Sequence, residues 1–90
     1  MKRYVRNMNL RIRKSEAGIE MVFVPGEGCV NELNEEASVI LEQFTSPSTI
    51  EDMRKNLLNI YAVDDFDTFI KETDQIITRF LTRKILLECD

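Results

Sequence analysis

The first third of the chain alternates apolar and polar positions in short runs, which predicts β-strands. Residues 8–14 alternate with a period of two, the pattern of a half-buried strand. Residues 15–18 supply a turn, and the mostly apolar residues 19–24 predict a partner strand. Residues 25–28 contain proline and glycine and end this hairpin, and residues 29–33 predict a short third strand. We therefore expect a three-stranded antiparallel sheet.

Beyond the third strand the apolar positions repeat at helical spacing, which predicts helices. Asn34 is a suitable N-cap for a first helix, and the two glutamates that follow it suit the positive end of the helix dipole. Ser48 and Glu51 form a capping box, so we expect a second helix from there to about Tyr61. The apolar stripe of the first helix comprises Ala37, Ile40, Leu41 and Phe44.

A third helix is expected from about Asp65 to Arg83, and it carries more apolar residues than one core-facing stripe needs. One stripe comprises Phe66, Ile70, Ile77 and Leu81. The other comprises Phe69, Ile76 and Phe80. Two interpretations are open: both stripes pack between the first helix and the sheet, or the second stripe lines a groove on the outer face. Residues 85–87 predict a short extended tail or strand.

The expected order is three strands followed by three helices, which indicates a single α+β domain over residues 1–90. The second helix, a tight connector and the third helix, beside a small sheet, form the pattern of a winged helix-turn-helix. A chain of this length buries about 60% of its unfolded surface, which is enough for one modest core.

The residue composition excludes several classes of function. The chain has no histidine, so histidine-based acid–base or nucleophile chemistry is excluded within it. Its two cysteines, Cys29 and Cys89, do not supply the four ligands of a structural zinc site. We interpret them as reduced thiols of a cytoplasmic protein; a disulfide between them would require the two segments to meet. No apolar run is longer than four residues, the length of residues 21–24, which is far shorter than the ~20 residues of a membrane span. We expect no enzymatic activity, cofactor, metal or membrane partner.

The net charge of −4 hides an uneven distribution along the chain. Residues 1–14 carry six basic side chains and no acidic one, whereas residues 15–90 carry six basic and sixteen acidic side chains, a balance of −10. We interpret the basic residues as the solvent side of a strand; a basic arm for nucleic acid or an acidic partner is the alternative.

Three stretches, in order, resemble the PqqD-like family (pyrroloquinoline quinone biosynthesis protein D-like). The first is residues 30–37 (VNELNEEA), followed by an isoleucine and a leucine. The second is residues 48–53 (STIEDM), which leads to residues 61–64 (YAVD), and the third is residues 80–87 (FLTRKILL). The resemblance covers roughly residues 8–88. One departure is Ile85, which stands where glycine is usual in the family.

The resemblance implies a bacterial recognition module for ribosomally made, post-translationally modified peptides. Such a module binds the leader segment of a precursor peptide and presents it to a separate modifying enzyme, such as a radical S-adenosylmethionine enzyme, a cyclase or a protease. The leader is expected to add a strand beside the third strand and to lie against the third helix. The implied site comprises Cys29, Val30, Asn31, Glu32, Leu33, Phe69, Thr73, Ile76, Ile77, Phe80 and Lys84. The sequence leaves open whether the protein forms a homodimer.

The alternative function is a DNA-binding regulator that uses the same winged-helix pattern. Its third helix would enter the major groove with basic or amide side chains. Residues 64–78, however, hold five carboxylates and one lysine, a balance of −4 that would repel phosphates. Only the basic residues 1–14 favour this alternative, so we expect no nucleic-acid partner.

We predict that the protein has no useful affinity for duplex DNA, because the chain beyond residue 14 carries a charge of −10. Fluorescence anisotropy with a random duplex at about 150 mM salt checks this. Binding tighter than the non-specific range of roughly 10⁻⁴–10⁻⁶ M would contradict it.

Overall fold

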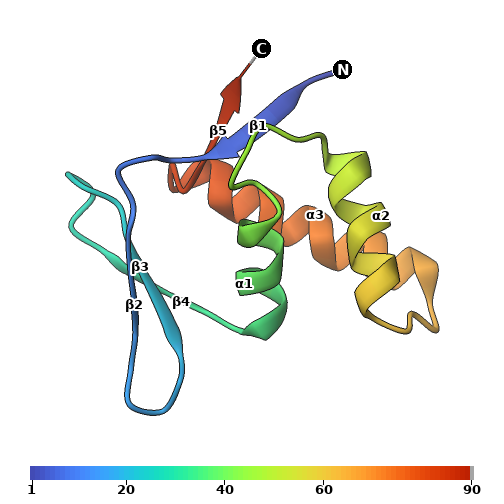
Figure 1. The fold of residues 1–90 in the computed structure, drawn as a ribbon, viewed down its shortest axis with the longest axis horizontal. Helices are drawn as coiled ribbons and strands as arrows, with labels where there is room; N and C mark the ends of the chain where they lie inside the picture. The colour runs from blue at the N-terminus through green and yellow to red at the C-terminus, as the bar shows by residue number, and fades with distance from the viewer. Residues whose placement is uncertain (90) are drawn as a thin grey trace.

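The computed structural model describes residues 1–89 and has an α+β fold. Strands β2 (Arg11–Lys14), β3 (Glu20–Phe23) and β4 (Val30–Leu33) form an antiparallel sheet in the order β2-β3-β4 (Figure 1). In this sheet Val22 of β3 lies between Ile12 and Asn31. The three predicted strands are therefore confirmed, with shorter bounds than expected.

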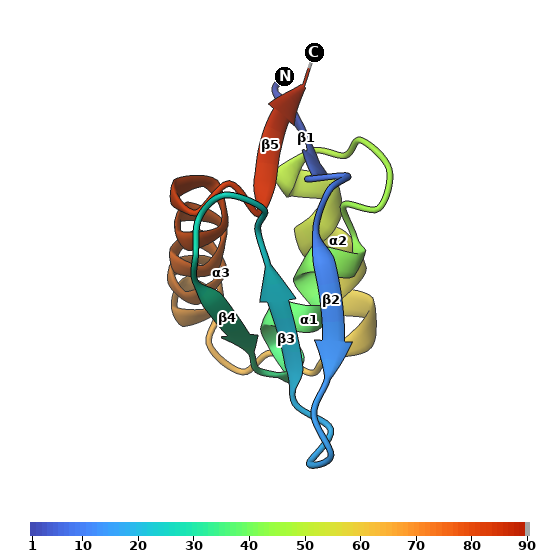
Figure 2. The same ribbon diagram turned by 90° about the vertical axis from the view of Figure 1, so that its left-hand side faces the viewer.

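Three helices follow the sheet, as the apolar spacing predicts. They are α1 (Glu35–Glu42), α2 (Ile50–Ile60) and α3 (Phe66–Thr82). All three lie on one side of the β2-β3-β4 sheet, so the other side of the sheet faces solvent (Figure 2). None of the helices within residues 1–89 is long and apolar enough to cross a membrane.

A second small sheet joins the two ends of the described chain, which the sequence analysis did not predict. Strand β1 (Arg3–Arg6) pairs antiparallel with β5 (Leu86–Cys89). The backbone of Tyr4 also exchanges two hydrogen bonds of 2.8 and 2.9 Å with Ser48, on the connection between α1 and α2. The strand predicted as one alternative for residues 85–87 is confirmed as β5, whereas β1 and its pairing with β5 were not predicted, so the predicted order of a sheet and then helices is incomplete.

The core lies between the inner face of the main sheet and the helices. On β4 the side chains alternate: Asn31 and Leu33 point inward and are buried, whereas Val30 and Glu32 are exposed. The largest fully buried apolar side chains come from all three helices, β3, β5 and the segments that flank α1 and α3. They are Phe44, Phe80, Ile40, Leu41, Met53, Leu57, Ile85, Leu86 and Val22.

Helix α3 does not pack with the two apolar stripes that the sequence predicts. Its buried face comprises Phe69, Thr73, Ile77 and Phe80. Residues at these spacings, i, i+4, i+8 and i+11, share one side of a helix, so a single stripe faces the core. Of the two interpretations left open by the sequence, the outer stripe does not hold for Phe69 and Phe80, because both are buried. Ile70, Ile76 and Leu81 flank the core half-buried, and Phe66 is 56% exposed.

Thr73 is the one polar member of that buried face, and hydrogen bonds satisfy its hydroxyl group. The hydroxyl lies 3.0 Å from the carbonyl oxygens of Phe69 and Ile70, to which it donates. It accepts a bond of 3.1 Å from Nε of Arg54 on α2. The guanidinium of Arg54 also pairs with Asp74. Thr73 therefore joins α2 to α3 inside the fold.

The C-terminal end of α3 is closed by a Schellman motif. The N–H of Ile85 donates to Phe80 O at 2.9 Å, and the N–H of Lys84 donates to Leu81 O at 3.2 Å. Lys84 has φ 60°, the left-handed conformation that glycine usually supplies at this position. The turn leaves the side chain of Ile85 fully buried. It also directs the chain into β5.

The second helix is capped by Thr49 and not by the predicted Ser48. The side chain of Thr49 accepts from the N–H of Asp52 at 3.1 Å. Ser48 lies one residue before the cap, and its backbone pairs with Tyr4 of β1. This pairing, which the sequence analysis missed, shifts the helix start by one residue.

We predict that Thr49→Ala lowers the free energy of unfolding by about 1 kcal/mol, because it removes the capping oxygen. Ser48→Ala is the matched control and should cost less than about 0.5 kcal/mol, since its hydroxyl contributes only a long bond of 3.4 Å to Thr49 O. Urea denaturation of both variants measures the difference. An equal or larger loss in the Ser48 variant would contradict the assignment of the cap.

Candidate functional site

Strand β4 is an edge strand whose outer side has no backbone partner within residues 1–89. Val30–Leu33 pair with β3 on one side only. No backbone hydrogen bond joins these residues to another described segment. In an antiparallel ladder, alternate residues direct their N–H and C=O groups away from the neighbouring strand. The outer side of β4 therefore presents unpaired donors and acceptors.

A groove with a volume of about 610 Å³ separates this edge from α3. Glu32 and Leu33 contribute from β4, and four residues of α3 form the opposite wall. The remaining walls come from the residue before β3 and from the start of α1. Its full lining is Ile19, Glu32, Leu33, Asn34, Glu36, Ala37, Glu72, Gln75, Ile76 and Arg79. The β4 edge and α3 lie side by side, as Figure 2 shows.

One end of α3 is tied to β4 by a hydrogen bond between side chains. Nη1 of Arg83, the C-cap of α3, donates to Oδ1 of Asn31, which is only 5% exposed. The neighbouring Lys84 lies 3.7 Å from a carboxylate oxygen of Glu27, just before β4. These contacts hold the end of the helix against the start of the strand, while the rest of the groove stays open.

The residues of the site predicted from the sequence are divided among four environments. Glu32, Leu33 and Ile76 line the groove. Cys29 and Val30 line a different hollow, on the solvent side of the sheet, and Lys84 is exposed at the end of α3. The other predicted residues are buried in the core and do not reach the groove surface. They are Asn31, Phe69, Thr73, Ile77 and Phe80.

Several groove residues were missed by the sequence analysis. On α3 they are Glu72, Gln75 and Arg79, which share with Ile76 the face next to the buried one. Their spacing of i, i+3, i+4 and i+7 was the available signal, but three of the four are polar and look like an ordinary solvated face. Ile19 was assigned to a strand and not to a site.

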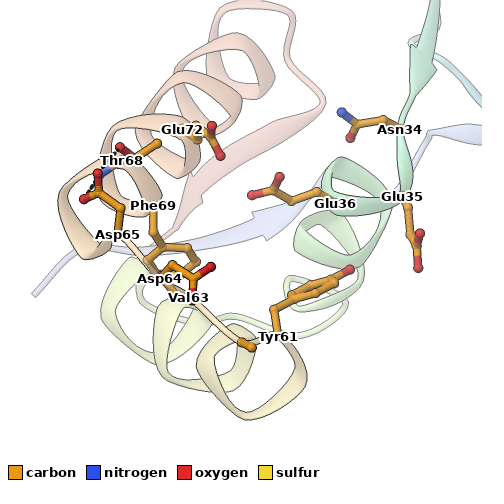
Figure 3. A pocket seen from close by; sticks show the side chains of 11 residues that line it. Asn34, Glu35, Glu36, Tyr61, Val63, Asp64, Asp65, Thr68, Phe69 and Glu72 are labelled. Carbon is orange, nitrogen blue, oxygen red and sulfur yellow. Dashed lines mark hydrogen bonds between the residues drawn. The ribbon is translucent and has the colours of Figure 1, made fainter.

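An acidic pocket of about 480 Å³ continues the groove past the start of α1. Asn34, Glu36 and Glu72 line both hollows, which therefore share a border. Figure 3 shows the side chains of Glu36 and Glu72 pointing toward one another, with the α2–α3 connector below them. The pocket lining also holds Glu35, Asp64, Asp65, Thr68, Tyr61, Ala62, Val63 and Phe69, and no lysine or arginine.

The electrostatics of this pocket raise the pKa of two of its groups and lower that of a third. Burial, and then the negative charge of Glu72, raise the pKa of Glu36. Burial and the charges of Glu35 and Glu36 raise the pKa of Tyr61. The pKa of Asp65 is lowered, because the side chain and then the backbone of Thr68 donate hydrogen bonds to the carboxylate that caps α3. The interior of the pocket thus carries uncompensated negative charge.

Neither the acidic pocket nor the groove has the arrangement of a metal centre. Within residues 1–89 no group of three or more histidine, cysteine, aspartate or glutamate side chains is placed to hold a metal ion. Cys29 and Cys89 are both free thiols, so the disulfide that the sequence left open does not form here.

Comparison with known proteins gives no match: no family model, no curated protein and no solved structure is significantly similar to this chain. The resemblance to the PqqD-like family therefore stays an expectation from sequence. A proposal of function must be supported by the free edge of β4 and the groove beside it.

We predict that Glu36 titrates above its ordinary pKa of 4.5 in an NMR titration of the folded protein. The folded state then keeps this proton to higher pH than the unfolded state does. Ionisation of Glu36 therefore lowers stability as the pH rises through the folded pKa. Glu72→Gln should bring the pKa of Glu36 part of the way back, because burial is the larger cause.

Asp65 is the internal control for this titration. Its pKa should lie below 3.8 in both proteins, because Thr68 and not Glu72 determines it. A pKa of Glu36 at or below 4.5 would contradict the described environment of this carboxyl.

Proposed function

We propose that this domain is a non-catalytic module that captures the leader segment of a ribosomally synthesised precursor peptide. The leader adds a strand to the outer edge of β4 and lies in the groove against α3. A separate modifying enzyme, such as a radical S-adenosylmethionine enzyme, a cyclase or a protease, then acts on the bound peptide. The observation that carries the proposal is the unpaired edge of β4 beside an open groove.

Strand addition suits this surface for a physical reason. The ladder of an edge strand supplies main-chain hydrogen bonds to any extended peptide, and the neighbouring pockets select its side chains. Ile76 and Ile19 offer the groove's larger apolar contacts, and both are partly exposed before any peptide binds. The peptide would therefore gain affinity from the backbone and specificity from the groove.

A winged-helix arrangement is part of the same proposal. Helix α2, a connector of residues 61–65 and α3 would form the helix-turn-helix, and the β2–β3 hairpin would form the wing. The wing strand β2 exposes Arg11, Arg13 and Lys14, which is the one observation in favour of a DNA-binding regulator. The acidic side chains Asp67, Glu72 and Asp74 on α3 oppose that alternative.

The bacterial cytoplasm is the compartment that fits this function. Precursor peptides are made on ribosomes there, and the two free thiols, Cys29 and Cys89, would stay reduced. This location, like the peptide partner, is part of the proposal.

Hydrogen exchange measured by NMR tests the mode of binding directly. A random dodecamer peptide display library, selected on the immobilised protein, supplies the probe peptide. On binding, the outward amides among Val30–Leu33 should exchange at least roughly tenfold more slowly, because they become bonded to the added strand. The outward amides of β2, the other edge of the same sheet, should keep their rates.

Two variants on α3 provide a matched comparison for the same peptide. Ile76→Ala should weaken binding about fivefold to tenfold through lost apolar contact, whereas Thr78→Ala, outside the groove lining, should change it little. Phe80 is unsuitable for this test, since it is fully buried in the core. Protection of β2 instead of β4 would overturn the proposal. So would protection of β4 by raised protein concentration alone, because a second copy would then be its partner.

A further inference from the structure

Within residues 1–89 neither edge of the main sheet is paired with another strand, and the two edges carry opposite charge. At one edge, β2 exposes Arg11, Arg13 and Lys14 and contains no acidic residue. At the other edge, β4 exposes Glu32, and the groove beside it is lined by two further glutamates and a single arginine. An extended peptide of either charge therefore meets one attractive edge and one repulsive edge.

The negative charge on the β4 side increases toward the start of α1. Glu36 and Glu72 face one another where the groove meets the acidic pocket (Figure 3). The pocket beyond contains further carboxylates and no cation among its lining residues. Burial, and then the charge of Glu72, make ionisation of Glu36 harder, and a cation placed between these carboxylates would offset the repulsion between them and favour the ionised form.

The opposite end of the groove differs in charge. Arg79 lines the groove there, and Arg83 bonds to Asn31 near the start of β4. A strand lying along β4 would thus pass from a basic end, beside the last turns of α3, to an acidic end, beside the first turn of α1. The apolar side chain of Ile76 lies between Glu72 and Arg79 on the same helix.

We propose that the strand added to β4 is a cationic peptide segment, with lysine or arginine side chains that bind Glu36 and Glu72 and an apolar side chain that contacts Ile76. This inference rests on the proposed function, because it specifies the chemistry of the peptide that the β4 edge captures. The unpaired backbone groups of β4 supply the binding surface. The charge difference between the two edges of the sheet determines which peptide binds and to which edge it binds.

The same dodecamer display library tests the inference without knowledge of the natural peptide. Peptides selected on the wild-type protein should be enriched in lysine and arginine over the unselected library. They should bind Glu72→Lys about fivefold to tenfold more weakly, because the substitution replaces an attraction by a repulsion. Selection on Glu72→Lys should lower the lysine and arginine content.

Glu42→Lys on α1 is the matched control, since it makes the same charge change at an exposed residue outside the groove and the pocket. It should leave both affinity and selected composition unchanged. Circular dichroism should show both variants folded, because Glu72 and Glu42 are exposed.

The possible failures of the two proposals are distinguishable. If selected peptides protect β4 amides but are not rich in lysine and arginine, or bind Glu72→Lys as tightly as wild type, the inference is overturned and the proposed function stands. If acidic peptides are selected and protect β2, or if no selected peptide protects β4, the proposed function itself is overturned.

Discussion

A buried amide holds the candidate site together. Asn31 points into the core from a strand that otherwise buries an apolar side chain, and Arg83 satisfies its carbonyl oxygen. A buried acceptor without a partner costs about 1–3 kcal/mol, so the end of α3 and the start of β4 stay together. The inward direction of Asn31 also determines that Glu32 points outward. The hydrogen bond thus joins one end of α3 to β4, and the alternation of the strand exposes Val30 and Glu32 on its other face.

The open part of the groove depends on how α3 is packed. Phe69, Ile77 and Phe80 bury one face of the helix, which leaves the adjacent face with Glu72 and Ile76 toward the β4 edge. The residues of α3 that hold the fold are therefore separate from those that line the groove. Here the two sets are neighbours on a single helix.

The sequence predicted the elements well and their surroundings less well. Sequence patterns located the three strands of the main sheet and all three helices. Strands β3 and β4 and each helix bury one face, whereas β2 was located by its period-two pattern although all four of its residues are exposed. The strand β1 was missed, since RYVR is short and rich in arginine, and its pairing shifted the cap of α2 to Thr49. The sequence left open whether Phe69 and Phe80 lie in the core, because the polar Thr73 interrupts the buried face of α3 and its hydrogen bond from Arg54 comes only from the tertiary structure.

The pairing of β1 with β5 has a consequence for how the domain could be connected to other proteins. Arg3 lies opposite Cys89, so both ends of the described chain leave from the same place, away from the turn between β2 and β3 (Figure 2). An enzyme tethered to either end would start from nearly the same point in space. The order in which the two were joined would then matter little to their relative placement, and the length of the tether would determine how far the joined protein reaches.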